Sequence, residues 1–89
     1  MRAVITVIGN DKTGIIAKVS NALADINVNI FDITQTTMQE LLTMIMLVDI
    51  SKCAVEFGEF ADSLERTGRE IGVVISVWHE DIFNSMHKI

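Results

Sequence analysis

Apolar residues recur along this chain at two spacings, and the first strand that they predict is apolar on both faces. In residues 2–8, Val4, Ile5, Val7 and Ile8 are β-branched, a composition that favours a strand. A strand with two apolar faces usually lies in the middle of a sheet. We therefore expect residues 2–8 to form a central strand.

Two later stretches space their apolar residues as an amphipathic helix does. The first runs from about residue 14 to 25 and the second from about 54 to 70. Asn27 stands where a helix commonly ends in a left-handed residue, which asparagine tolerates, and Gly68 or Gly72 could end the second helix. The apolar positions are Ile16, Val19, Leu23 and Ile26 in the first helix, and Phe57, Phe60, Ala61, Leu64 and Gly68 in the second.

Three more stretches are predicted as strands. Residues 28–37 begin apolar and become polar and rich in threonine, which is typical of an edge strand or a solvated face. Residues 41–50 and 73–79 are mainly apolar, and a turn is expected at 38–40. Residues 80–89 could form a short amphipathic helix.

The order strand, helix, strand, strand, helix, strand predicts an α+β, ferredoxin-like βαββαβ sandwich. Right-handed crossovers give a four-stranded antiparallel sheet of order 4-1-3-2, with both helices on one face. We expect residues 1–89 to form one domain, in which 80–89 are a tail. The first strand is then central and the second lies at an edge.

That edge predicts association between copies of the chain. An unpaired edge strand is a template for another chain, and the open sheet face is expected to carry Met44 or Ile45 together with Ile30 and Phe31. We therefore expect a homodimer whose sheets join edge to edge, with a higher oligomer left open. The alternative is a monomer with a capped edge.

Composition narrows the choice of partner. The 89 residues carry a formal net charge of −5, with a sequence pI of about 4.7 and a mean hydropathy of +0.40. Nucleic-acid binding usually needs a basic face, so we expect no direct nucleic-acid partner. The longest apolar run is too short to span a membrane, and the single Cys53 excludes an internal disulfide, so a reducing cytoplasmic setting is expected.

The turn at residues 9–14 is the strongest candidate for a ligand site. It leads from the first strand directly into a helix, whose first N–H groups have no partner within the helix and carry partial positive charge. Asp11 or Thr13 is a candidate N-cap. The turn could equally serve only the fold, with Asp11 as a cap and Gly14 as a packing residue.

These residues resemble an ACT domain, a small regulatory module that binds amino acids. The resemblance lies in residues 7–16, in Val19, in Leu23-Ala24 and in residues 27–30, and the run 42–48 is similar to the family's third strand. It covers about residues 2–79 and is closest to stand-alone ACT proteins of bacteria and archaea. It also extends to the ACT modules of the glycine cleavage system transcriptional repressor. Asn27 departs from the family's usual glycine.

The resemblance implies a ligand site shared by two subunits. One subunit would supply Asn10, Asp11, Thr13, Gly14 and Ile15, and the partner would supply Asn29 and Ile30. The chemistry fits a zwitterion: the helix N-terminus receives a carboxylate, Asp11 an amino group, and Asn29 both donates and accepts.

Signals for an enzyme are absent from the sequence. No nucleophile stands beside a base, no arginine lies in the 9–14 turn as an acylphosphatase would need, and no cofactor is indicated. The inner strands also lack the stacking aromatics of an RNA-binding sheet. Cys53 is predicted to pack, and a metal site on His79 and His87 would require the tail to fold back.

We therefore expect a homodimeric module that binds a small ligand, an amino acid by the resemblance, and that regulates another protein, which the sequence does not identify. The alternative is a ligand-free module for protein–protein association.

Overall fold

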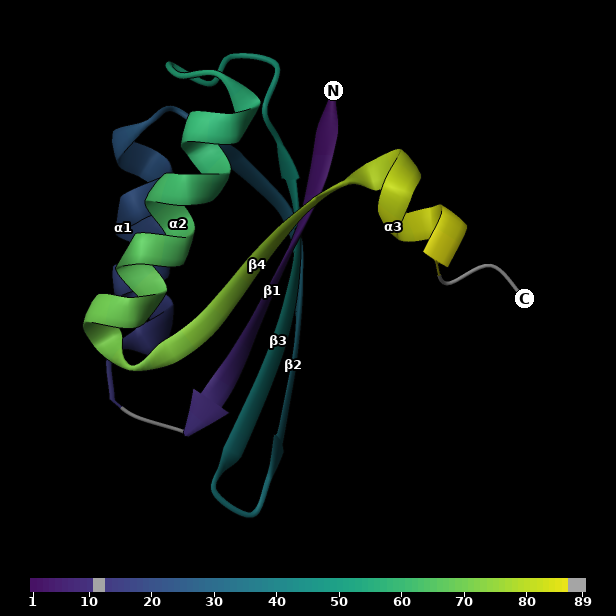
Figure 1. The fold of residues 1–89 in the computed structure, drawn as a ribbon. Coiled ribbons are helices and arrows are strands. Elements are labelled where there is room, and N and C mark those ends of the chain that lie inside the picture. The colour runs from purple at the N-terminus through teal and green to yellow at the C-terminus, as the bar shows by residue number, and fades with distance from the viewer. Residues whose placement is uncertain (11–12, 87–89) are drawn as a thin grey trace.

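The computed structural model describes residues 1–10 and 13–86, and its elements follow the predicted order (Figure 1). The sheet is antiparallel, with strand order β2-β3-β1-β4. This is the predicted 4-1-3-2 read from the other edge, so the ferredoxin-like fold is confirmed. The elements are β1 (Arg2–Asn10), α1 (Ile15–Asp25), β2 (Asn29–Met38), β3 (Leu41–Asp49), α2 (Phe57–Ile71), β4 (Val73–His79) and α3 (Glu80–Met86).

The core lies between the sheet and the two long helices. Figure 1 shows α1 and α2 on the same face of the sheet, with α2 beside β4 and α1 behind it. Alternate residues of β1 point into this core, where Ala3, Ile5 and Val7 are fully buried. The central position predicted for the first strand is confirmed.

The register of β3 decides which residues reach the outer face of the sheet. Met44 is fully buried in the core, whereas Ile45 is on the outer face and 39% exposed, so Ile45 is the correct one of the two predicted residues. Ile30 pairs with the buried Val48 and faces the helices, so its predicted place on the open face is wrong. A β-bulge follows it, and Phe31 is exposed.

The second helix begins at Phe57, three residues later than predicted. The N–H of Ala54 donates to the carbonyl oxygen of Ile26 at 2.9 Å, which ties this segment to the end of α1. The first helical hydrogen bond then runs from the Phe60 N–H to the Glu56 carbonyl. The segment before residue 57 is therefore tied to the end of α1, and its Cys53 and Val55 pack against the core.

A close contact between α2 and β4 depends on Gly68. A methyl group at this position would lie 2.8 Å from Ile75 Cγ1 and 2.9 Å from the carbonyl oxygen of Val73. Gly72, in a left-handed conformation with φ 81°, ends the helix. Gly72 is therefore the C-terminal stop, and Gly68 is a packing residue.

The short helix α3 forms within residues 80–89, where a short helix was expected, and lies on the sheet face opposite α1 and α2 (Figure 1). Arg2 holds it through two contacts with the Glu80 carboxylate, of 2.8 and 3.1 Å. None of the helices described is long and apolar enough to cross a bilayer.

We expect Gly68→Ala to lower the free energy of unfolding by about 1–3 kcal/mol, because the added methyl group forces α2 away from β4. Gly58→Ala is the matched control in the same helix, since nothing lies within 4 Å of an added methyl group there, and alanine favours a helix over glycine by up to ~1 kcal/mol. Urea denaturation of both variants measures the difference. Equal stability of the two would contradict the close packing.

Candidate functional site

The predicted site begins where β1 ends against β4. A methyl group on Gly9 would lie 2.7 Å from Val73 Cγ1, so only glycine lets the two strands approach this closely. Asn10 is the last residue of β1, is exposed, and pairs with Leu41 of β3. The chain therefore leaves the sheet at a fixed point, with a polar side chain at its rim.

Among the described residues, no side chain caps the start of α1. Gly14 is the N-cap, with φ 87°, and it has no side chain that could accept a hydrogen bond from the helix. Of our two candidates for the N-cap, Thr13 is therefore wrong, and Asp11 lies outside the described residues. Because the first intrahelical hydrogen bond is the one from the Lys18 N–H to the Gly14 carbonyl, at 3.0 Å, the N–H groups before it are available to an anion.

Ile15 is only 3% exposed and packs in the core. Its side chain cannot line a ligand site, so only its backbone N–H could contribute. Thr13 and Gly14 are both exposed. A methyl group on Gly14 would meet nothing within 4 Å, which leaves open space beside the helix start.

The second half of the predicted site follows the end of α1. Asn27 has φ 62°, as predicted from its position, and its Nδ2 donates to the carbonyl oxygen of Lys52 at 3.1 Å. The Val28 N–H donates to the Leu23 carbonyl at 3.0 Å. This turn delivers Asn29, which is exposed, and Ile30, which is half-buried, to the start of β2.

The two halves lie at opposite ends of the sheet within one chain. Asn10 pairs with Leu41 at the start of β3, whereas Asn29 pairs with Asp49 at its end. Eight residue steps along a strand separate these ends by about 26 Å. No amino acid is long enough to bridge that distance, so the structure does not bring the two halves together in a single subunit.

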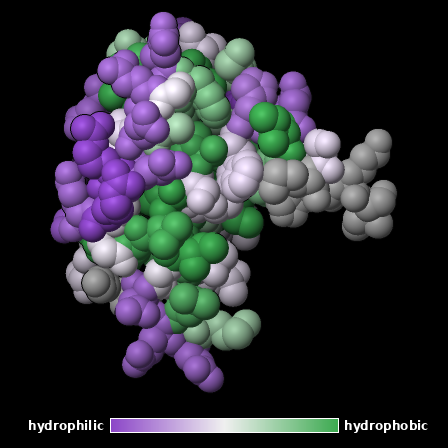
Figure 2. Space-filling view, in the orientation of Figure 1, coloured by the Kyte–Doolittle hydropathy of each residue, from purple (hydrophilic) through white to green (hydrophobic). Residues whose placement is uncertain are grey.

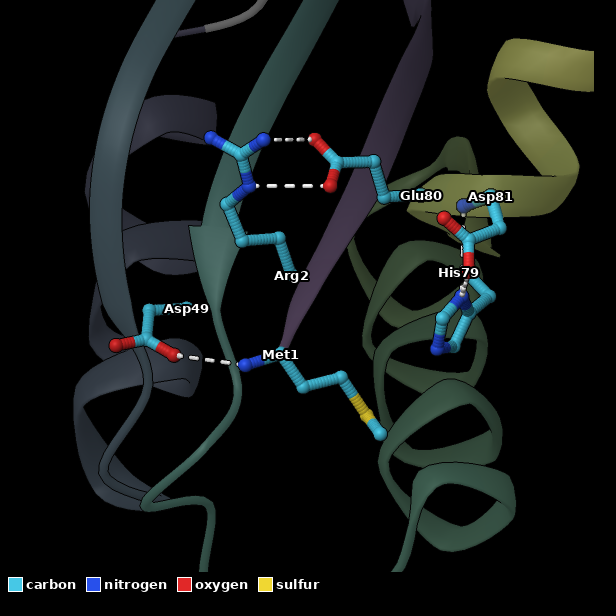
Figure 3. Close-up of polar contacts among 6 residues, drawn as sticks. All are labelled: Met1, Arg2, Asp49, His79, Glu80 and Asp81. Carbon is cyan, nitrogen blue, oxygen red and sulfur yellow. Dashed lines mark hydrogen bonds and ion pairs between the residues drawn. The ribbon is translucent and has the colours of Figure 1, made fainter.

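A polar cluster that our sequence analysis missed lies at the end of β3, where Asp49 pairs with Asn29. Figure 3 shows Asp49 beside the N-terminus of Met1. The Ser51 N–H donates to Asp49 Oδ1 at 2.9 Å, and the N-terminal ammonium of Met1 lies 3.9 Å from the same oxygen. The hydrogen bonds from Ser51, and then the positive N-terminus, hold the pKa of Asp49 below its ordinary value of 3.8. The Asp-x-Ser spacing at 49–51, a common turn pattern, was the available signal.

The structure describes only one of the two histidines that a metal site in the tail would need. His79 Nδ1 accepts the Asp81 N–H at 3.4 Å, and its ring stacks edge-on against Phe57 with centroids 5.9 Å apart. His87 lies outside the described residues. Among residues 1–10 and 13–86 no group of three ligating side chains could hold a metal ion. Cys53 packs against the core, as predicted.

A shallow cavity of about 250 Å³ lies elsewhere, beside the free edge of β4. Its lining contains none of the predicted site residues. The lining residues are Glu65, Arg69, Val73, Val74, Ile75 and Ser76.

The matches with known proteins include the residues of both halves of the predicted site. The sequence model of the ACT domain family matches residues 2–77. A UPF0237 protein of Methanocaldococcus jannaschii is 53% identical over 88 residues, 99% of this chain and 98% of that protein. The structure of an ACT domain protein from Streptococcus pneumoniae matches with a TM-score of 0.83, at 38% identity over 98% of each chain. The regulatory subunit of aspartate kinase from Thermus thermophilus matches with a TM-score of 0.65 at 29% identity, over 85% of this chain and 49% of that one.

We expect Asp49 to stabilise the fold in a pH-dependent way. Because the pKa of Asp49 is lowered in the folded protein, its contribution is fully present above the ordinary value of 3.8 and is lost as the pH falls through the lowered pKa. Asp49→Asn should therefore be less stable than the wild type in urea at pH 7, and the difference should shrink below pH 3.8. A difference that stays constant down to pH 2 would contradict this account.

Proposed function

We propose, because this chain belongs to the ACT domain family, that it is a regulatory module in which two copies bind an amino acid at their shared interface. The observation that carries the proposal is the separation of Asn10 and Asn29 at opposite ends of one subunit. A single chain offers half a site at each end of its sheet. A second chain, suitably turned, offers the other half.

The free edge of β2 provides the contact that joins the halves. Nine of its ten residues are exposed, all but Ile30. After the β-bulge that follows Ile30, the strand from Ile33 to Met38 contains no proline, charge or further bulge that would protect its edge. Antiparallel pairing of two β2 strands, centred near Ile33, places Asn29 of each subunit opposite Met38 of the other. Met38 pairs with Leu41, which pairs with Asn10, so both halves lie at the same end of the joined sheet.

The chemistry at this end suits a zwitterion. The uncapped N–H groups after Gly14 receive the carboxylate, and the left-handed backbone of Gly14 keeps side-chain atoms out of the way. Asn29 of the partner supplies a donor and an acceptor. Asp11, predicted from the sequence to receive the amino group, completes the charge balance, and Ile30 contributes apolar surface at the rim.

The family supports regulation rather than catalysis as the role of this module. The structurally similar protein from Thermus thermophilus is itself described as a regulatory subunit. We place the homodimer in the cytoplasm, acting on a separate protein and without an enzymatic activity of its own. A ligand-free association module is the second candidate, because the exposed β2 edge alone would also serve it.

We expect at least one of the twenty amino acids to raise the melting temperature of the wild-type protein, because a ligand that binds only the folded state stabilises it. Gly14→Asp should abolish the shift, since its carboxylate would occupy the helix N-terminus. Asn29→Ala should weaken affinity by roughly ten-fold or more, the value of a hydrogen bond to a charged group. If no amino acid shifts the melting temperature, the ligand-free alternative is favoured.

Mixing the two variants tests whether the site is shared. Each homodimer of Gly14→Asp or of Asn29→Ala carries only damaged sites, whereas a mixed dimer carries one intact site and one doubly damaged site. After unfolding and refolding an equal mixture, about a quarter of all sites should be intact, as expected for random assembly of a two-fold dimer. Isothermal titration calorimetry measures this recovery. No recovery would place the site within one chain.

A further inference from the structure

The second edge of the sheet, along β4, is regular and uncharged. β4 is the last strand in the order β2-β3-β1-β4, so no described strand lies on its outer side. It pairs with β1 from Val73 to His79 without a bulge, and residues 73–78 contain no proline and no charged side chain. Proteins usually protect an edge with a charge, a proline, a bulge or a covering segment. The edge of β4 has none of the first three, so its unpaired backbone groups can pair with a further strand.

The helix α2 runs beside β4 in the opposite direction over the whole length of the strand. The Phe57 ring, at the start of α2, contacts the His79 ring at the end of β4, with centroids 5.9 Å apart. Near the other end, Gly68 is packed against Val73 and Ile75. Figure 2 shows hydrophobic side chains along β4, bordered on one side by the hydrophilic surface of α2. A strand added at this edge would therefore lie beside the helix as well as beside β4.

Two side chains of opposite charge line the cavity of about 250 Å³ between α2 and the edge of β4. Glu65 and Arg69 are both exposed, and neither takes part in an ion pair among the described residues. They stand four residues apart on α2, a rise of about 6 Å. Side chains two residues apart on one face of a strand are separated by about 7 Å. Alternate side chains of an added strand therefore match the spacing of Glu65 and Arg69.

We propose that the edge of β4 binds an extended segment of another protein as a fifth strand, with a basic residue opposite Glu65 and an acidic residue two positions later opposite Arg69. When a strand adds to a sheet edge, backbone hydrogen bonds supply affinity and pockets for alternate side chains supply specificity. The order of the charges follows from direction, because a strand antiparallel to β4 runs with α2 and passes Glu65 before Arg69. Antiparallel pairing is the form that β4 already makes with β1, and it is the slightly more stable form.

The required charge pattern points to another protein rather than to a second copy of this chain. In the 89 residues, no lysine or arginine stands two positions before an acidic residue. The β4 strand of a second copy would place only the uncharged residues 73–78 against the cavity. Pairing of copies through both β2 and β4 would also leave a free edge at each end of the assembly, so that growth would not stop.

The inference goes beyond the proposed function, and the binding itself does not rest on it. None of the residues that line the cavity belongs to the proposed amino-acid site, and β4 lies at the opposite edge of the sheet from β2. A dimer joined at its β2 edges therefore keeps both β4 edges free. Only the identification of the bound partner with the regulated protein rests on the proposed function.

Two blocked peptides of the same composition test the inference by nuclear magnetic resonance titration of the isotope-labelled full chain. The first is Gly-Ser-Thr-Lys-Val-Glu-Thr-Ser-Gly, and the second exchanges the positions of its lysine and glutamate. We expect the first peptide to shift the backbone resonances of residues 73–78 and to slow the hydrogen exchange of their outward-facing N–H groups. It should bind roughly five-fold more tightly than the second, the effect of two partly exposed ion pairs.

Charge reversal on α2 tests which side chains recognise the peptide. Glu65→Lys with Arg69→Glu keeps the net charge and should reverse the preference between the two peptides. Asp62→Lys with Arg66→Glu is the matched control, since it makes the same changes at the same spacing, at exposed positions outside the cavity lining, and it should keep the wild-type preference. Circular dichroism confirms that each variant is folded. Arg69→Gln, which should only remove the preference, replaces the reversed variant if that variant unfolds.

No response of residues 73–78 to either peptide, or equal binding of the two peptides, overturns the inference. Sedimentation equilibrium tests the other occupant: if Arg69→Glu lowers the oligomeric state below that of the wild type, the β4 edge binds a second copy and the inference is wrong. The proposed function is tested separately, because an amino acid that stabilises the wild type should stabilise both double variants to the same extent.

Discussion

The pairing of β1 with both of its neighbours is the constraint on which the rest of the molecule depends. β1 lies between β3 and β4, and Ala3, Ile5 and Val7 are completely buried under the helices. This position leaves the strand no freedom to slide, because a shift of one residue would expose every core side chain. The end of β1, and with it the start of α1, is therefore fixed in space by the core.

The same pairing explains why each chain carries the two halves of the proposed site at opposite ends of its sheet. β1 and β2 run in the same direction, because both are antiparallel to β3. The residues after β1 and those before β2 must then lie at opposite ends of the sheet. Among ferredoxin-like folds this follows from topology rather than from side chains, so a site that uses both segments needs two chains.

The edge of β2 and the uncovered part of the outer sheet face expose different kinds of chemical group. The β2 edge has unpaired backbone groups along an exposed strand, which could form hydrogen bonds with another strand. The part of the outer sheet face that α3 leaves uncovered has a paired backbone but exposed hydrophobic side chains, which would be stabilised by removal of their apolar area from water. The short α3, held by the contact between Arg2 and Glu80, determines how much of the outer sheet face stays uncovered.

The sequence by itself determined the order of elements, the central place of β1 and the left-handed turn at Asn27, because hydrophobic spacing and local backbone preference act over a few residues. It also determined the resemblance to the ACT domain family. Only the tertiary structure decided what depends on register and on distant neighbours. It showed that Met44 is buried and Ile45 exposed, and that Ile15 belongs to the core. It also showed that α2 begins only at Phe57, because the Ala54 N–H bonds to the Ile26 carbonyl. The distance between Asn10 and Asn29 is also of this kind, since it is set by how β3 pairs with two strands at once.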